Sequence, residues 1–286
     1  MENRDNLLSA ALQAIQQKTF YQHYWRTFDI VHAQTDELRE RAFRLRYDIF
    51  CRENQFEPAT DPAGMERDAY DRKAIHFLMV HRDSGDDAGT VRVLLPDEGN
   101  LQESFPLQEL CDHPLLLIDH KVRKMAEISR LCMAHRFRRR PMDGKILPAY
   151  YETEMRDVDK GLGRFFRRRI PYAPLGLLKA AFEASMEFGI PDMVTSMDPN
   201  YFRTMKRIGL SYRVLGPRID YHGKQQPVVF NIKNVLDNMM LENPECWEIV
   251  SDQGRLHKIA NTMAQNEWHD NIFDEDCRDM IMKKLI

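Results

Sequence analysis

Closely spaced cysteines are missing from this 286-residue chain, whose five cysteines form no CxxC motif or other paired spacing. A disulfide framework and a zinc site both depend on such spacing, so the sequence indicates neither. The histidines also lack the spacing of metal ligands, and we expect no metal. Reduced, intracellular thiols are expected at Cys51, Cys111, Cys132, Cys246 and Cys277.

Long apolar runs and a strong charge imbalance are absent as well. No stretch approaches the roughly 20 apolar residues that a membrane span needs, and the charged N-terminus is typical of a helix rather than a signal peptide. The net charge is -3 and charged residues make up 30% of the chain, which excludes disorder and a generally basic nucleic-acid binder. We expect a soluble, cytoplasmic protein with no nucleic-acid partner.

The first half of the sequence predicts a helix and an antiparallel meander. Apolar residues Leu38, Ala42, Leu45 and Ile49 recur at helical spacing and indicate a helix over residues 36–51. Short, polar connections between the strands favour antiparallel pairing. The strands expected in this half are residues 28–33, 74–80, 88–95 and 125–134.

From Pro174 the pattern changes to helix and strand in alternation. A helix ends at the cap residue Gly189, and a strand, a second helix and a strand pair follow. This order predicts an α+β fold with a mixed, mostly antiparallel sheet flanked by helices and a C-terminal helical extension. We expect a single domain, 1–286, with a core at about 28–232, a basic insertion at about 136–172 and a helical tail at about 233–286.

Charged residues embedded in apolar segments are the most informative feature of the sequence. Burying an ion without a partner costs several kcal/mol, so these side chains are expected to meet one another. One reading is a substrate site, and the alternative is a structural lattice of ion pairs that fixes the N-terminal helix and loop. The residues are Arg46, Asp68, Asp71, Arg92, Glu127 and Arg130.

Strand alternation separates two of these residues. Glu127 and Ser129 fall on one face of the predicted strand 125–134, and Arg130 falls on the other. We therefore expect Glu127 and Arg130 to serve different sides, one facing the substrate and the other bracing the helix behind it.

Four motifs in order resemble the signature of the acyl-homoserine-lactone autoinducer synthases. They are RLRYDIFCRE (Arg44 to Glu53), DAYD (Asp68 to Asp71), GTVRVLLP (Gly89 to Pro96) and EISR (Glu127 to Arg130), and the resemblance spans about residues 28–232. It implies the fold of the GNAT N-acetyltransferases and acyl-acyl-carrier-protein as the usual donor. It also implies functional roles for Arg46, Phe50, Asp68, Asp71, Arg92, Glu127 and Arg130.

Two departures from that family distinguish this chain. The family carries a tryptophan after the first motif where the nearest aromatic here is Phe56, and an extra segment follows EISR. In both respects the chain is similar to the acyltransferases of the PEP-CTERM/exosortase system and to the long-chain N-acyl amino acid synthases. The resemblance thus implies a fatty acyl group transferred to an amino acid or a similar small amine.

Amide formation from a thioester gives each group a candidate role. Glu127 is the expected base or water-orienting residue, and Asp68 and Asp71 are expected to hold the ammonium group. Backbone N–H groups after Ser129 would polarise the thioester oxygen. Arg92 or Arg130 would bind the acceptor's carboxylate, and the sequence leaves open which of them does.

A basic segment lies between the two halves of the chain. We interpret it as a dock for acyl carrier protein, or for the anionic inner leaflet of the membrane, with a solvated loop as the alternative. Its sequence lacks the RxxGxG loop that grips coenzyme A, which favours a carrier-protein donor and no permanently bound cofactor. The docking residues expected are Arg136, Arg138, Arg139, Arg140, Arg167, Arg168 and Arg169.

Two further functions remain as alternatives. The same chemistry with S-adenosylmethionine would make the chain an acyl-homoserine-lactone synthase, which the missing tryptophan near Phe56 disfavours. A non-catalytic module that binds membrane or nucleic acid through the basic segment is the alternative from another class.

Overall fold

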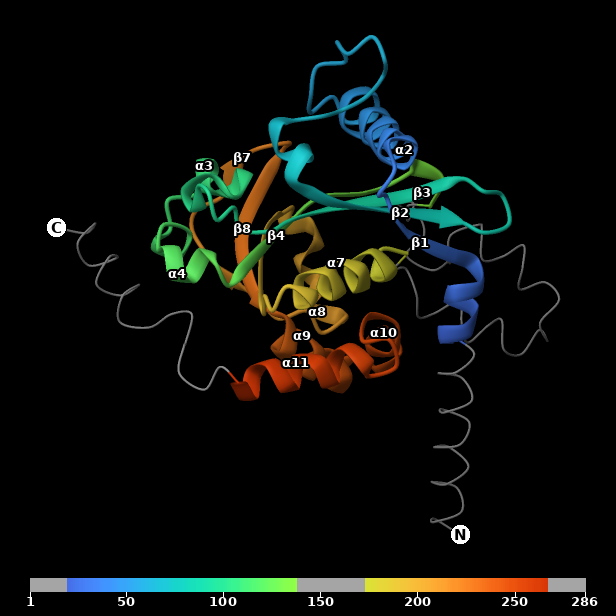
Figure 1. The fold of residues 1–286 in the computed structure, drawn as a ribbon. Helices are drawn as coiled ribbons and strands as arrows, with labels where there is room; N and C mark the ends of the chain where they lie inside the picture. Colours follow the sequence, from blue (N-terminus) through green and yellow to red (C-terminus); the bar gives the residue numbers. More distant parts are fainter. Residues whose placement is uncertain (1–19, 138–172, 267–286) are drawn as a thin grey trace.

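A mixed sheet of eight strands organises the fold, and helices cover both of its faces (Figure 1). The computed structural model describes residues 20–137 and 173–266. The strands are β1 (Phe28–His32), β2 (Ala74–His81), β3 (Asp87–Leu94), β4 (Met125–Met133), β5 (Asp192–Met197), β6 (Arg213–Val214), β7 (Ile219–Asp220) and β8 (Lys224–Asn231). The α-helices are α2 (Asp36–Arg46), α3 (Pro106–Leu110), α4 (Asp119–Val122), α7 (Leu175–Glu187), α8 (Phe202–Arg207), α9 (Ile232–Glu242), α10 (Pro244–Val250) and α11 (Arg255–Asn266).

The strand order confirms the predicted meander. Strands β1 to β4 pair antiparallel with their sequence neighbours, and the sheet continues in the order β5, β8, β6 with β7 paired to β8. β4 and β5 run parallel, joined through α7, and β5 pairs antiparallel with β8. The fold is therefore the predicted α+β arrangement, in which one parallel pair interrupts a mostly antiparallel sheet.

Helix α2 begins as the sequence indicates and ends in an unexpected geometry. The Oγ1 atom of Thr35 accepts a hydrogen bond from the N–H of Leu38 (3.3 Å), and Ala42 lies on the buried side against the sheet. The helix was expected to continue to about Cys51, but from Tyr47 to Glu53 it widens into π-helical turns. Such turns are rare and are often found at functional sites.

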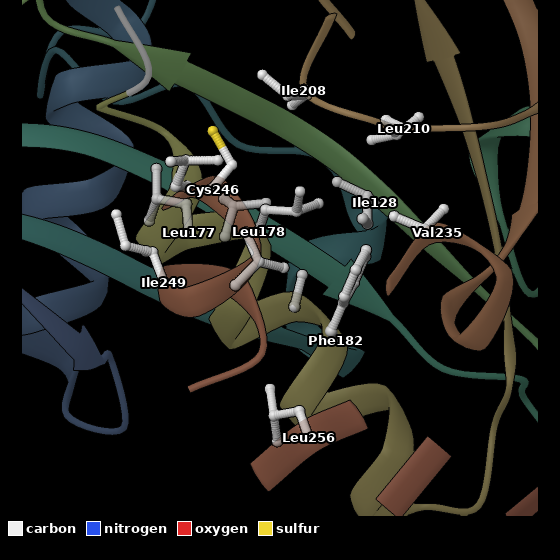
Figure 2. Close-up of a cluster of buried hydrophobic side chains, with 14 of the residues drawn as sticks. Ile128, Leu177, Leu178, Phe182, Ile208, Leu210, Val235, Cys246, Ile249 and Leu256 are labelled. Atoms are coloured by element: carbon white, nitrogen blue, oxygen red, sulfur yellow. The ribbon is translucent and has the colours of Figure 1, made fainter. Parts of the chain in front are cut away.

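The apolar core lies on the face of the sheet opposite α2. Helix α7 packs there against β1 to β4, and α10 and α11 pack against α7 in turn (Figure 1). Figure 2 shows Ile128 of β4 near Phe182 of α7 and Val235 of α9, while Ile249 of α10 lies by Leu177 in the same cluster. The predicted C-terminal helical extension is confirmed over α9 to α11, where it completes this core.

No helix within the two described ranges combines the length and apolar character needed to cross a bilayer. Within the same ranges, no group of three histidine, cysteine or carboxylate side chains is arranged to hold a metal ion.

Candidate active site

Three arginines and three carboxylates form a closed ring of alternating charge on the α2 side of the sheet. Each side chain is paired with two of opposite sign, so the ring carries no net charge. We call this group the charge ring. Its members, in the order of their contacts, are Arg46, Glu66, Arg130, Asp68, Arg92 and Asp71.

Arg46 and Arg92 share one carboxylate of the ring. Arg46 lies at the end of α2, and its Nη1 and Nη2 atoms donate to the two carboxylate oxygens of Asp71 (2.7 and 3.1 Å). Arg92 Nη1 donates to Asp71 (2.9 Å) and to Asp68 (2.6 Å). The two aspartates form a capping box around the helical turn that starts at Ala69, so local backbone geometry fixes both acids.

Arg130 and Glu66 close the other half of the ring. Arg130 donates from Nη2 to Asp68 (3.1 Å) and from Nε to Glu66 (3.1 Å), and Glu66 also accepts from Arg46 Nε. The N–H of Glu66 donates to the carbonyl of Phe43 in α2 (3.1 Å), which holds this loop residue against the helix.

The ring keeps its two buried carboxylates, Asp71 and Glu66, ionised. Burial alone would raise the pKa of Asp71, but hydrogen bonds from Arg46 and the charges of Arg46 and Arg92 hold that pKa well below its usual value. Burial likewise opposes ionisation of Glu66, and the charges of Arg46 and Arg130 lower its pKa. The ring is thus a set of mutually neutralised charges.

Glu127 is the acid that the ring does not neutralise. Its side chain is buried in β4, and Oε2 accepts a hydrogen bond from the N–H of Leu107 at the start of α3 (2.9 Å). Burial raises the pKa of Glu127 to about 7, against the lowering effects of the Leu107 N–H and the charges of Arg92 and Arg130. A carboxylate with a pKa near neutrality can take up a proton and release it under physiological conditions.

The prediction that Glu127 and Arg130 serve different sides is wrong. Between the pairs Thr90–Cys132 and Arg92–Ser129, β3 has one residue and β4 has two, which is a β-bulge. Arg130 sits in the bulge with a φ of 53°. The extra residue shifts the alternation of β4. Arg130 therefore points to the same side of the sheet as Arg92 and Ser129, where the charge ring lies.

A second feature of β4 is its divergence from β5. The two strands pair over three positions, from Met125 with Asp192 to Glu127 with Val194, although β4 continues to Met133 and β5 to Met197. Glu127 therefore stands at the last paired position, where the gap between the strands opens. Beyond it, N–H groups of β4 on this side have no ladder partner in β5 and can bind an oxygen atom.

Aromatic side chains border the ring on the side of Arg130. The Arg130 guanidinium lies over the rings of Phe50 (5.7 Å) and Tyr221 (5.9 Å). Phe56, predicted to bind substrate, is 42% exposed and stacks on His222 (6.1 Å between centroids). Phe50 and Phe56 also contact each other (6.4 Å between centroids), so both lie beside the charge ring.

Six of the predicted residues lie in the charge ring or contact it directly, and Arg136 lies apart from it. Arg46, Asp68, Asp71, Arg92 and Arg130 are in the ring, and Ser129 Oγ accepts from Arg92 Nε (3.0 Å). Arg136 is an exposed residue paired with Asp86 in the β2–β3 turn, away from these contacts. The remaining predicted docking residues lie outside the described ranges: Arg138, Arg139, Arg140, Arg167, Arg168 and Arg169.

Three contributors to the site were missed in the sequence. Glu66 follows an irregular loop, where no periodicity distinguishes a buried acid from an exposed one. Tyr221 meets Arg130 across 91 positions of sequence, and the Leu107 contact to Glu127 involves a backbone atom. A signal was available only for Glu66, which lies two residues before the DAYD motif that carries Asp68.

Sequence comparison finds a family model that overlaps the residues of this site. Residues 45–147 match the model of the acetyltransferase (GNAT) domain family. The chain carries a GNAT domain and is an acyltransferase. The matched residues include the whole charge ring and Glu127, whereas Tyr221 and His222 lie outside them. No curated protein matches the acyltransferase in sequence.

Several solved structures are similar to the acyltransferase in fold. FeeM, an N-acyl amino acid synthase from uncultured soil microbes, is 12% identical with a TM-score of 0.49, over 75% of this chain and 95% of FeeM. BjaI, a coenzyme-A-dependent acyl-homoserine lactone synthase, is 18% identical with a TM-score of 0.47, over 80% of this chain and 89% of BjaI. TofI, in a complex with an inhibitor and MTA, is 18% identical with a TM-score of 0.49, over 77% of this chain and 100% of TofI. At these identities the similarity concerns the fold alone.

Proposed function

We propose that this acyltransferase transfers a long-chain fatty acyl group from an acyl-carrier-protein thioester to the amine of an amino acid or similar small amine. The observation that carries the proposal is the position of Glu127. It is a buried acid with a pKa raised to about 7, outside a neutral charge ring and at the point where β4 and β5 separate.

Glu127 is suited to remove the proton that amide formation releases. The amine nitrogen attacks the thioester carbonyl, the C–S bond breaks, and the carrier leaves as a thiol. One proton of the original ammonium group is left over, and the Glu127 carboxylate accepts it directly or through water. A base with a pKa near 7 is ionised often enough to act and basic enough to accept the proton.

The charge ring changes the roles that the sequence suggested for its members. The donors of Arg130 are occupied by Glu66, Asp68 and Tyr221. In Arg92 the buried Nη2 atom has no hydrogen-bond partner among the described residues. An unsatisfied buried donor is costly. We therefore assign Arg92 Nη2, rather than Arg130, to the substrate's carboxylate or to the oxyanion.

The two aspartates of the ring differ in how far their side chains are exposed to solvent. The side chain of Asp68 is 26% exposed and that of Asp71 is 6% exposed, and both accept hydrogen bonds from ring arginines. Asp68 is therefore the ring acid that we assign to the ammonium group of the acceptor. Asp71 serves the site by holding Arg46 and Arg92 in place.

The donor is proposed from the sequence and from one contact. The basic segment and the missing RxxGxG loop favour acyl carrier protein over coenzyme A, and a carrier-protein donor implies a cytoplasmic reaction. Arg136 is the docking residue within the described ranges, and its exposed side chain can exchange Asp86 for an acidic partner. The two departures from the autoinducer synthases, which the chain shares with the N-acyl amino acid synthases, support the acceptor class.

Product analysis tests the proposal. Purified protein would receive acyl-carrier-protein or coenzyme A thioesters, together with pooled amino acids or with S-adenosylmethionine, and mass spectrometry would identify the products. We expect N-acyl amino acids, formed faster from the carrier-protein thioester. Loss of the base in Glu127→Gln should lower kcat/KM by about 10²–10⁴-fold.

The matched control is Glu98→Gln, which alters an exposed glutamate paired with Arg123 and should retain full activity. Acyl-homoserine lactones without acyl amino acids would replace the proposal by the lactone synthase. Undiminished activity of Glu127→Gln would remove the assignment of the base.

A further inference from the structure

The turn between β7 and β8 reaches across the gap between β4 and β5. In the sheet, β5 lies between β4 and β8, so the turn and Arg130 stand on opposite sides of the gap. The Oη atom of Tyr221, in this turn, nevertheless accepts a hydrogen bond from Arg130 Nη1 (2.9 Å). This contact therefore crosses the gap beyond the last β4–β5 pair.

His222, the next residue of the turn, attaches to the segment that follows α2. Its ring stacks on Tyr221 (4.1 Å between centroids) and on Phe56 (6.1 Å), and Nε2 donates to Glu57 Oε1 (2.5 Å). Burial and the charge of Arg130 lower the pKa of His222, which favours the neutral ring in this position. The turn therefore joins two segments that are more than 160 residues apart in sequence.

Backbone strain is concentrated at the same contacts. Among the described residues, five that are not glycine have a positive φ. Two of them, Arg130 (53°) and His222 (52°), take part in these contacts, and a third, Gln55 (53°), directly precedes Phe56. Each such conformation is energetically costly and persists only where the surroundings enforce it. Strain of this kind clusters at functional sites, so the turn is more than a surface connection.

Tyr221 completes the hydrogen bonding of Arg130. Within the described ranges it is the one uncharged hydrogen-bond partner of that guanidinium, whose other donors bind Glu66 and Asp68. Without the Tyr221 hydroxyl, Nη1 would lack a partner, and the guanidinium could rotate away from Phe50. Arg130 also donates to Asp68 (3.1 Å), the acid assigned to the acceptor's ammonium group, so the position of this guanidinium fixes that acid.

We propose that Tyr221 and His222 form a clasp across the gap that positions Arg130 and thereby sets the affinity of the site for the acceptor amine. The inference rests on the proposed N-acyltransferase function and adds two positioning residues to it. Tyr221 holds the guanidinium, and His222 holds Tyr221 through its ring and through Glu57.

Steady-state kinetics with Tyr221→Phe test the clasp. We expect the KM for the acceptor amine to rise about tenfold, since a hydrogen bond to a charged group is lost, while kcat and the KM for the acyl donor stay within about twofold. His222→Asn, which suits a positive φ but removes the stacked ring, should change the same constant in the same direction. Tyr212→Phe is the control, because Tyr212 is half-buried and stacks on Phe202 outside the clasp.

Three outcomes would overturn the clasp. Unchanged acceptor KM in both variants would show that Arg130 needs no positioning from the turn. A joint fall of kcat, both affinities and melting temperature would show that the turn only supports the fold. A wild-type protein that forms no product with any thioester and amine would overturn the proposed function and the clasp together, whereas an active wild type with normal variants overturns the clasp alone.

Discussion

Strands β3 and β4 present two opposite chemistries on their two faces. Toward α7 they carry Val91, Val93, Ala126 and Ile128, which pack into the apolar core of Figure 2. Toward α2 they carry Arg92, Glu127 and Arg130, which are as deeply buried as the apolar residues. One face is thus held together by apolar packing, whereas the other combines matched charges with a small apolar cluster that packs α2 against the sheet.

The charged face shows where stability is given up for function, because burying ions requires their desolvation. An apolar side chain on the charged face would avoid the desolvation of ions, and a buried ion pair is often no more stable than an apolar replacement. The charges are nevertheless present as six paired groups plus one unmatched acid, Glu127. We interpret the ring as the support that holds Glu127 and the gap in a working arrangement.

The largest effect is expected from opening the charge ring. Arg46→Leu removes the arginine that binds both Glu66 and Asp71 and leaves those buried acids with one arginine each. We expect the free energy of unfolding to fall by about 3–5 kcal/mol, the range for breaking one side of a buried ion pair. Urea denaturation measures the change.

Arg41→Leu is the matched control on the same helix. Its side chain is 36% exposed and pairs with Asp87, so its loss should cost at most about 1 kcal/mol. Adding Asp71→Asn to Arg46→Leu should cost less than the sum of the two single changes, because both act on one pair. Equal costs for Arg46→Leu and Arg41→Leu would contradict the distinction between the ring and ordinary surface pairs.

A smaller effect on the free energy of unfolding, confined to a defined pH range, is expected from Glu127. Glu127 has a pKa of about 7 in the folded protein against 4.5 for the ordinary group. Stability that depends on its raised pKa is fully present below pH 4.5 and is lost as the pH rises through about 7. A difference of this size corresponds to about 3 kcal/mol.

Glu127→Gln isolates that contribution. The amide oxygen of glutamine can still accept the hydrogen bond from the Leu107 N–H, but the amide does not ionise. Between pH 5 and pH 8.5, the free energy of unfolding should therefore fall by about 3 kcal/mol less in the variant than in the wild type. Unfolding by urea at both pH values gives the comparison. If wild type and variant lose the same stability over this interval, Glu127 has an ordinary pKa and is a poor candidate for the base.

Much of the fold follows from local patterns. The alternating segments that became β2, β3 and β4 lie within two residues of the predicted limits, since alternation and polar turns mark such strands clearly. The helix before Gly189 was also marked at its end, because that residue adopts a φ of 70°. The π-helical turns after Arg46 carry no such mark, because their side chains continue the spacing of α2.

The site was predictable in its members and less so in its arrangement. Ions inside apolar segments must find partners, and this argument correctly brought together Arg46, Asp68 and Arg130. The prediction from strand alternation was wrong at Arg130, because a β-bulge inserts one extra residue and shifts the alternation. An arginine in the sequence gives no sign that its φ will be positive. The bridge from Tyr221 depends on how distant segments pack, which no local pattern contains.

The smallest effect is expected on the apolar face of β4. Ile128 is the neighbour of Glu127 in sequence and points to the opposite side of the sheet, where it is 5% exposed beside Phe182. Ile128→Val removes one methylene, which should lower the free energy of unfolding by about 0.5–1.5 kcal/mol. Its kcat/KM and its pH dependence of stability should match those of the wild type, because no charge of the ring is touched. If Ile128→Val altered the pH dependence as Glu127→Gln does, the two faces of β4 would not act independently, and the ring could not be treated as a separate support for the base.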